Sequence, residues 1–159
     1  MKLRRIPLLA AAVAGVAATV SSAAQNAEDE ARSAVVALFA AIRAKDEAGL
    51  RAVTVPETRI IGIRSVAGQT SLRPTRFEDF IRTLVESEMQ LDEQNWDFEV
   101  SIKGDLANVW QRFNMYIDGA LHHCGTEAIH LFRSPEGWKI IQISETLTEE
   151  GCEPRPEER

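Results

Sequence analysis

The amino-acid sequence predicts an α+β fold, with helices packed on one face of a curved antiparallel sheet. In the first half of the chain, apolar residues recur at the 3.6-residue spacing of helices. From Trp96 onwards, apolar and polar residues alternate, which is the period of half-buried strands. Two turn sequences, Asp118-Gly119 and Ser134-Pro135-Glu136-Gly137, divide this second half into hairpins. Helices followed by a meander of strands are typical of this class.

Residues 1–24 are predicted to be a signal peptide that is cleaved near Ala24. Three of the first five residues are basic, Ile6 to Val20 is apolar and alanine-rich, and small residues follow at 22–24. This apolar run is shorter than the ~20 residues of a membrane-spanning helix. An uncleaved N-terminal anchor is the alternative. Cleavage predicts an exported protein, periplasmic or secreted, that has left the membrane.

Charge and length limit the partners and the number of domains. The leader contains Lys2, Arg4 and Arg5 and no acidic residue, so the remainder keeps 15 of 18 basic and all 24 acidic residues. The resulting net charge of −9 argues against a nucleic-acid partner. Residues 25–150 have the size of one domain with a single core. Residues 151–159, made of Gly, Pro and charge, are predicted to be a disordered tail.

Three helices are expected in the first half. The first begins at Asn26, a good N-cap, and ends near Lys45. The second is short, with Asp46 as its cap, and is closed by Pro56. The third follows a hairpin of residues 58–66 and 70–73.

The third helix is expected to start at a capping box, in which Thr75 and Glu78 satisfy each other's backbone donors. Its apolar stripe runs over 77–85. Four longer strands should follow over residues 96–103, 106–118, 121–133 and 138–146. The first of these is expected to carry its apolar side chains on one face, namely Trp96, Phe98, Val100 and Ile102.

The order of elements resembles the nuclear transport factor 2-like (NTF2-like) superfamily, which includes ketosteroid isomerase-like and polyketide cyclase-like (SnoaL-like) proteins. The similar segments are Asp105-Leu106-Ala107-Asn108-Val109-Trp110, Tyr116-Ile117-Asp118-Gly119, His123-Cys124-Gly125, Glu136-Gly137-Trp138-Lys139-Ile140 and Glu150-Gly151-Cys152. His-Cys-Gly and Gly-Cys resemble one branch, which carries the label lumazine-binding. The resemblance, over residues 28–152, implies a pocket between sheet and helices and a homodimer formed through the outer sheet face. It implies no activity, because this fold hosts many.

The two turns allow a register to be predicted for the last three strands. The first turn would place Tyr116 opposite Leu121 and Asn114 opposite His123, and the second would place Glu127 opposite Ser144. The expected pocket face then mixes aromatic walls with convergent polar groups, and its ligand-binding residues are Trp110, Arg112, Asn114, Tyr116 and His123. The expected partner face carries Val109, Gln111, Phe113, Met115, His122, Cys124, Thr126, Ala128, His130, Ile141 and Ile143. A single bulge would exchange the faces.

Candidate catalytic residues are His123, Glu127 and Tyr116. Histidine titrates near neutral pH and a carboxylate can orient it, so His123 with Glu127 could act as a general acid–base pair. Tyr116 or Arg112 could then stabilise developing charge. Against this, positions 123 and 127 lie about 13 Å apart along one strand, and a structural, hydrogen-bonded histidine is favoured about two to one.

Metal and cofactor sites are not expected. His122 and His123 are adjacent on a strand and point to opposite faces, so they are poorly placed to chelate one ion. Phosphate-binding glycine loops, dinucleotide fingerprints and nucleophile elbows are missing from the sequence. Cys124 and Cys152 could form a disulfide in an exported chain, at about even odds. The alternative is a buried thiol at Cys124 and a free thiol in the tail.

The leading functional hypothesis is an exported binding or accessory module for a small, partly apolar molecule. The alternative is a cofactor-independent isomerase, dehydratase or hydrolase that uses His123 or Glu127 as base in the same pocket. A third hypothesis treats the pocket as vestigial and the domain as a dimerisation module.

Overall fold

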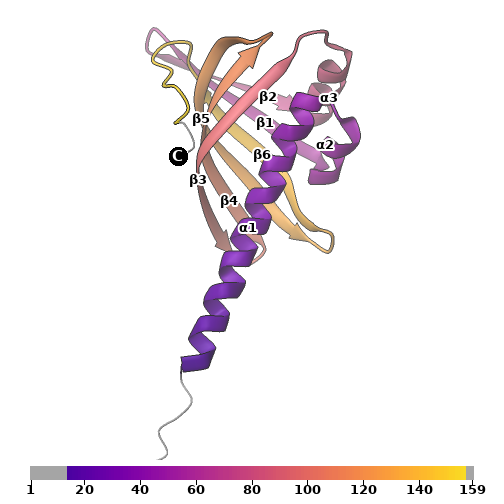
Figure 1. Cartoon of the computed structure of the whole chain (residues 1–159). Coiled ribbons are helices and arrows are strands. Elements are labelled where there is room, and N and C mark those ends of the chain that lie inside the picture. The colour runs from indigo at the N-terminus through magenta and orange to yellow at the C-terminus, as the bar shows by residue number, and fades with distance from the viewer. Residues whose placement is uncertain (1–13, 157–159) are drawn as a thin grey trace, which may run out of the picture.

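A single sheet of six strands carries the fold, in the order β2-β1-β6-β5-β4-β3. The computed structural model describes residues 14–156, with side chains from residue 22. The elements along the chain are α1 (Ala14–Ala44), α2 (Glu47–Val53), β1 (Thr54–Val66), β2 (Gln69–Arg76), α3 (Phe77–Glu86), β3 (Leu91–Lys103), β4 (Leu106–Ile117), β5 (Ala120–Ser134) and β6 (Gly137–Leu147). Helix α1 crosses one face of the sheet, with α2 and α3 near its C-terminal end (Figure 1).

The predicted α+β class is confirmed, but the sheet is mixed rather than antiparallel. Strands β1 and β6 pair in parallel, with Ile60 opposite Ile143 and Gly62 opposite Glu145. The other neighbouring strands are antiparallel. A hairpin turn dictates antiparallel pairing, whereas β1 and β6 are distant in sequence and no turn sets their direction. We call the face of the sheet that the helices cover the helix face; it carries Val109, Ile129 and Ile143. The opposite face is called the open face.

Helix α1 is longer than expected, since it begins at Ala14 and passes through Asn26 without a break. The predicted start at Asn26 is therefore wrong. The Asn26 side chain instead donates from Nδ2 to Glu30 Oε1 one turn later, at 2.9 Å. Alanine-rich sequence before Asn26 favours continuation of the helix. The basic start of the predicted leader lies outside the described residues, and cleavage near Ala24 stays a prediction.

No helix in the described part of the chain has both the length and the hydropathy to cross a membrane.

The two short helices begin differently. Asp46 caps α2 as predicted, accepting a hydrogen bond from the Gly49 backbone N–H at 3.1 Å. The capping box predicted for α3 is wrong: its N-cap is Arg76, and no side chain caps the helix. Thr75 cannot serve as the cap because it lies within β2, opposite Ile60 in the ladder. The strand thus runs directly into the helix.

A bulge in β3 separates apolar residues that were expected to share a face. The register shifts between Trp96 and Glu99, and Asp97 takes a positive φ of 56°. Trp96 consequently pairs with Arg112, while Val100 pairs with Val109. The predicted alternation from Trp96 to Ile102 is wrong at Trp96, which lies on the open face. Phe98, Val100 and Ile102 pack against the core.

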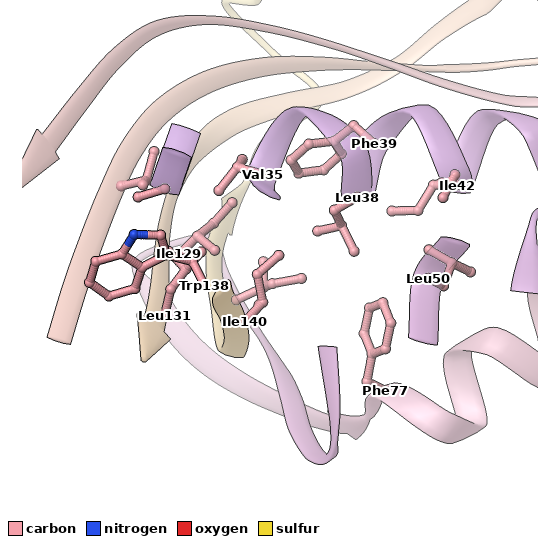
Figure 2. Close-up of a cluster of buried hydrophobic side chains, with 14 of the residues drawn as sticks. Val35, Leu38, Phe39, Ile42, Leu50, Phe77, Ile129, Leu131, Trp138 and Ile140 are labelled. Atoms are coloured by element: carbon pink, nitrogen blue, oxygen red, sulfur yellow. The ribbon is translucent and has the colours of Figure 1, made fainter. Parts of the chain in front are cut away.

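The core lies between α1 and the helix face. Val35, Leu38 and Ile42 form the buried stripe of α1, and they meet Ile129 and Ile140 of the sheet (Figure 2). Leu50 of α2 and Phe77 of α3 close one end of this core (Figure 2). Burial of a side chain of this size contributes about 1.5–3 kcal/mol to stability. The helical stripes predicted from the sequence therefore pack as expected.

A disulfide joins Cys124 to Cys152, which is the first of the two alternatives predicted from the sequence. Cys124 also pairs with Thr148 through two backbone hydrogen bonds. Residues just past the disulfide lie against the open face, where Glu153 accepts a hydrogen bond from Asn114 and forms an ion pair with Arg112 at 2.9 Å. The first residues of the predicted tail are thus attached to the sheet.

Candidate functional site

Two bulges decide which side chains face the helices. The predicted pairs Ile117–Ala120 and Tyr116–Leu121 are present, but the register then shifts and Met115, not Asn114, lies opposite His123. A second shift between β5 and β6 places Glu127 opposite Glu145 rather than Ser144. Each bulge moves the following residues of one strand to the other face. The predicted register is wrong beyond each shift.

The residues predicted for one pocket face are consequently divided between the two faces. His123 and Glu127 of β5 line a cavity on the helix face. Trp110, Arg112, Asn114 and Tyr116 of β4 lie on the open face, opposite that cavity. The helix face of β4 is formed by residues that had been expected at a partner interface, including Gln111, Phe113 and Met115.

The cavity lies between the helix face and helices α1 and α3, with a volume of about 410 Å³. This is the size of a pocket for a small organic molecule. Most of its wall is apolar, formed by Phe39, Ile42, Ile60, Phe77, Phe80, Leu91, Met115, Ile117, Ile143 and Leu147. The polar groups come mainly from β3, β5 and β6, so the sheet supplies most of the charge and the helices mostly supply apolar surface.

Three glutamates lie together in the wall formed by the sheet. Glu127 of β5 is opposite Glu145 of β6 and opposite Gln111 of β4. Glu93 of β3 completes the cluster, since it shares a side-chain hydrogen bond with Glu127. Glu93 and Glu127 are 5% and 1% exposed, so water cannot solvate their charges. We call Glu93, Glu127 and Glu145 the glutamate cluster.

Burial and mutual repulsion favour the protonated form of these carboxyls. Burial first, and then the charge of Glu145, raise the pKa of Glu127 to about 8, although a hydrogen bond from Gln111 opposes this. Burial and the charge of Glu127 raise the pKa of Glu93 well above its usual value. Burial alone raises the pKa of Glu145. At neutral pH the cluster therefore holds protons that exposed glutamates would have lost.

Besides the hydrogen bond that Glu93 and Glu127 share, two amides donate hydrogen bonds to the cluster. Asn95 Nδ2 donates to Glu93 Oε1 at 2.6 Å, and Gln111 Nε2 donates to Glu127 Oε2. The other amide atom of Gln111, Oε1, is buried without a hydrogen-bond partner. A buried acceptor left unpaired costs about 1–3 kcal/mol. The polar end of the cavity thus has more acceptors than donors.

His123 lines the cavity, and its side chain forms no hydrogen bond or ion pair with a carboxylate among the described residues. Its Nδ1 lies 2.8 Å from Nδ1 of His122, and its ring meets Phe113 edge-on. Burial, followed by the charges of His122 and Arg64, lowers the pKa of His123. The ring is therefore neutral at pH 7. The predicted His123–Glu127 pair is not formed as a hydrogen bond, although both side chains line one cavity.

Charged groups from β2 and α3 also reach the cavity wall. Among the described residues, Arg73 of β2 is the one lysine or arginine that lines it. Asp79 of α3 also lines it and is paired with Arg82 at 2.7 Å. The cavity therefore contains an excess of acidic groups over basic ones. Within residues 14–156, His, Cys, Asp and Glu side chains do not form a group of three that could hold a metal ion.

Sequence reasoning found Glu127 and missed Glu93, Glu145 and Gln111. Each of the three occupies a strand position where polar residues are ordinary, and only the register places them together. The one available signal was that Glu127 and Glu145 both interrupt apolar strands. The arrangement offers a protonated carboxyl that can donate a hydrogen bond, give up a proton or pair with a cation.

Comparison with known proteins defines the fold class. No protein-family model and no curated protein matches the chain. An NTF2-like protein with a cystatin-like fold from Novosphingobium aromaticivorans is 13% identical, with a TM-score of 0.63 over 89% of this chain and 95% of that one. An NTF2-like protein from Cytophaga hutchinsonii is 18% identical, with a TM-score of 0.61 over 76% and 97%.

A third similar structure, from Streptomyces avermitilis, is described as a candidate dehydratase of the NTF2-like family. It is 18% identical, with a TM-score of 0.59 over 79% of this chain and 98% of that one. At such identities the likeness shows the fold alone, which is NTF2-like with a cystatin-like arrangement of helix and sheet. The site must be interpreted from its own residues.

Proposed function

We propose that this protein is an exported binding module that holds a small, largely apolar molecule in the cavity between the helix face and α1 and α3. The observation that carries this proposal is an unfilled volume of about 410 Å³ between the sheet and the helices, in a cleft that is partly open to solvent. A cavity of this size with apolar walls and a few polar groups is the usual form of a small-molecule site.

Retention of a bound molecule tests the proposal. Protein purified from its own host is examined by native mass spectrometry, and we expect a mass excess that disappears on denaturation. Thr83 of α3 lines the cavity, so Thr83→Trp should occupy part of it and abolish the excess. Val85 lies on the same helix outside the cavity and is 43% exposed, so Val85→Trp is the matched control. Identical masses for the wild type and Thr83→Trp, after subtracting the substitution, would contradict the proposal.

Acid–base catalysis is a second candidate, favoured by Glu127. A carboxyl with its pKa near 8 in a water-poor cavity can accept and return a proton close to neutral pH. One structural neighbour is described as a candidate dehydratase, a reaction that requires such a group. The chain would then be a cofactor-independent isomerase, dehydratase or hydrolase. Tyr116 and Arg112 lie on the opposite face of the sheet, so the charge stabiliser would be Glu93 in its protonated form.

Deuterium exchange tests this candidate without knowledge of the substrate. The bicyclic ketone 2-tetralone is small enough for the cavity, and exchange of its α-hydrogens in deuterated buffer reports enolisation by a base. The candidate predicts exchange faster than in buffer alone, lost in Glu127→Gln and retained in Glu99→Gln. Glu99 is exposed on β3 outside the cavity. Equal exchange with wild type and with Glu127→Gln would remove the catalytic candidate and leave the binding proposal intact.

The proposal also includes export of the protein and formation of a homodimer. A disulfide between Cys124 and Cys152 supports an oxidising compartment, because cytosolic thiols are kept reduced. Exposed Leu106, Trp110 and Leu121 support a homodimer through the open face. Light scattering that compares the molar mass of Trp110→Glu with that of the wild type tests whether the open face forms the homodimer. The finer assignment to the lumazine-binding branch rests on the His-Cys-Gly and Gly-Cys segments.

A further inference from the structure

The cavity is more specific than an apolar pocket, because carboxyl groups dominate its polar lining. Three of its lining side chains are glutamates, contributed by three strands, and two of them are buried from solvent. Buried charges are ordinarily paired with an opposite charge. Within the described residues no basic side chain forms an ion pair with the glutamate cluster. Its hydrogen bonds come from the neutral amides of Asn95 and Gln111 and from the bond that Glu93 shares with Glu127.

An unpaired amide oxygen at the same place points in the same direction. Gln111 is 1% exposed, and its Nε2 donates to Glu127, which fixes the amide at the cluster. Its Oε1 is buried without a partner. Native proteins satisfy nearly all buried polar atoms. Gln111 does not itself line the cavity, so its unpaired oxygen indicates that the polar groups around the cluster are short of hydrogen-bond donors.

The groups that face the cluster offer little positive charge. From the elements around the cavity these are His123 of β5, Arg73 of β2 and Asp79 of α3, whereas α1 contributes only Phe39 and Ile42. His123 is neutral because its pKa is lowered by burial. Arg73 is exposed, so water screens its charge. A positively charged donor would therefore complement the site better than a neutral or negative one.

We propose that the ligand of this cavity is an apolar molecule carrying a basic nitrogen, and that the glutamate cluster holds the protonated nitrogen. This inference rests on the proposed binding function and names its ligand class. The ammonium group keeps its own proton and donates hydrogen bonds to the cluster. One carboxylic acid of the cluster ionises as the cation enters, and its proton passes to solvent. The bound state then contains one ion pair in a dry cavity, and one proton is released for each ligand bound.

A second consequence follows from this proton release. Affinity for the amine must rise with pH while the cluster still holds the proton to be released, and it must level off once that proton has been lost. With the pKa of Glu127 at about 8, the rise should cover the range from pH 6 to pH 8. A neutral ligand of the same shape needs no ionised carboxylate and should bind equally at both values.

Three probes of one shape test the inference: 1-naphthylmethylamine, 1-naphthalenemethanol and 1-naphthoate. Binding to the mature, oxidised protein is measured by isothermal titration calorimetry at pH 6 and pH 8. We expect the amine to bind at least tenfold more tightly than the alcohol at pH 8, and its affinity to rise roughly tenfold or more from pH 6 to pH 8. Titration in two buffers of different ionisation enthalpy should show release of about one proton.

Two substitutions assign the effect to the cluster. Glu127→Gln and Glu93→Gln keep the shape of the side chain and remove the acid, so both should reduce the amine's advantage to about threefold or less. Their unchanged affinity for the alcohol would show that the cavity is intact. Glu99→Gln makes the same chemical change on β3 at an exposed position and should behave as wild type.

The outcomes separate this inference from the binding proposal on which it rests. Tightest binding of naphthoate, or equal and pH-independent binding of amine and alcohol, would overturn the amine ligand and leave a binding cavity. An amine preference that persists in both Glu127→Gln and Glu93→Gln would place the cation elsewhere and overturn the role of the cluster. Failure of all three probes to bind would count against both proposals.

Discussion

The two faces of the sheet differ in how their charged side chains are paired. On the open face, Arg112 is paired with Glu153 at 2.9 Å and lies over the ring of Trp96. Both partners of this pair are partly solvated, and they hold the end of the chain against the sheet. On the helix face, Glu93 and Glu127 are buried, and the charge of Glu127 raises the pKa of Glu93. Neither carboxyl forms an ion pair with a basic side chain among the described residues. One face has its charges compensated by the chain itself, whereas the other leaves acids for something else to compensate.

This contrast separates stability from binding within one sheet. On the open face, the paired charges and the disulfide hold the tail against the sheet, and no ligand is needed to balance those charges. Buried acidic groups without an opposite charge lower the stability of the ligand-free protein. They are tolerated most readily where a bound molecule supplies that charge. Four predictions test this contrast, from the largest expected effect to the smallest.

The largest effect is expected at Gly125 of β5, where an added Cβ would meet the backbone of β6. A Cβ at this position would lie 1.8 Å from the Thr146 carbonyl oxygen and 2.9 Å from Phe113 Cε1. Backbone cannot yield as a flexible side chain does, so Gly125→Ala should lower the free energy of unfolding by about 3 kcal/mol or more. Urea denaturation measures the change.

Gly62 is the matched control for Gly125, since it is also a strand glycine. Its added Cβ would meet the flexible end of Leu147 at 3.3 Å, so Gly62→Ala should cost less than about 1 kcal/mol. Similar losses of unfolding free energy at the two positions would mean that β5 and β6 do not lie as close together at Gly125 as in the structure.

Removal of the disulfide should have the next largest effect. Cys124 and Cys152 are separated by 28 residues, and opening a loop of that length costs about 3 kcal/mol in the chain-entropy estimate. Cys124→Ala with Cys152→Ala should show this loss in urea denaturation. Reductant should lower the stability of the wild type by a similar amount and leave the double variant unchanged. Free thiols in the untreated wild type, detected by alkylation and intact mass, would refute the bond.

The glutamate cluster should make stability fall as pH rises. The folded-state pKa of Glu127, about 8, is raised above its unfolded value, so folded protein keeps a proton that unfolded protein loses. The stabilisation is complete below the unfolded pKa and is lost as pH rises through about 8. Because one pKa unit corresponds to about 1.4 kcal/mol, the wild type should lose about 2 kcal/mol more than Glu127→Gln between pH 6.5 and pH 9.

Urea denaturation at pH 6.5 and pH 9 measures this difference on ligand-free protein. Glu99→Gln should retain the pH dependence of the wild type. Parallel curves for wild type and Glu127→Gln would show that Glu127 titrates as an exposed glutamate does, which would remove the contrast between the two faces.

The smallest effect is expected for the ion pair on the open face. The side chains of Arg112 and Glu153 are 41% and 66% exposed, so solvent weakens their attraction. Glu153→Gln should change the free energy of unfolding by about 0.5 kcal/mol or less, and added salt should reduce that change. Glu150→Gln, close by, serves as control. A loss above about 1.5 kcal/mol would mean that the tail contributes more to the fold than its exposure indicates.

The candidate site could be predicted only in part, because two bulges lie where the sequence carries no signal for them. The turn residues Asp118-Gly119 correctly fixed the first pairs of the β4–β5 hairpin. Beyond Tyr116 one extra residue in β5 reversed the faces, so His123 and Glu127 reached the cavity while Arg112 and Asn114 did not. Side chains alternate with a period of two, and one inserted residue therefore changes every later assignment.

The sequence by itself determined the α+β class, the three helical segments, the two hairpin turns and the single core, because these follow from local periodicity and turn chemistry. Only the tertiary structure decided the parallel pairing of β1 with β6 and the cluster of Glu93, Glu127 and Glu145. These glutamates lie on three strands and are ordinary surface residues in any local window of sequence. Their shifted pKa values arise from burial and from one another, and both come into existence only when the strands are in register.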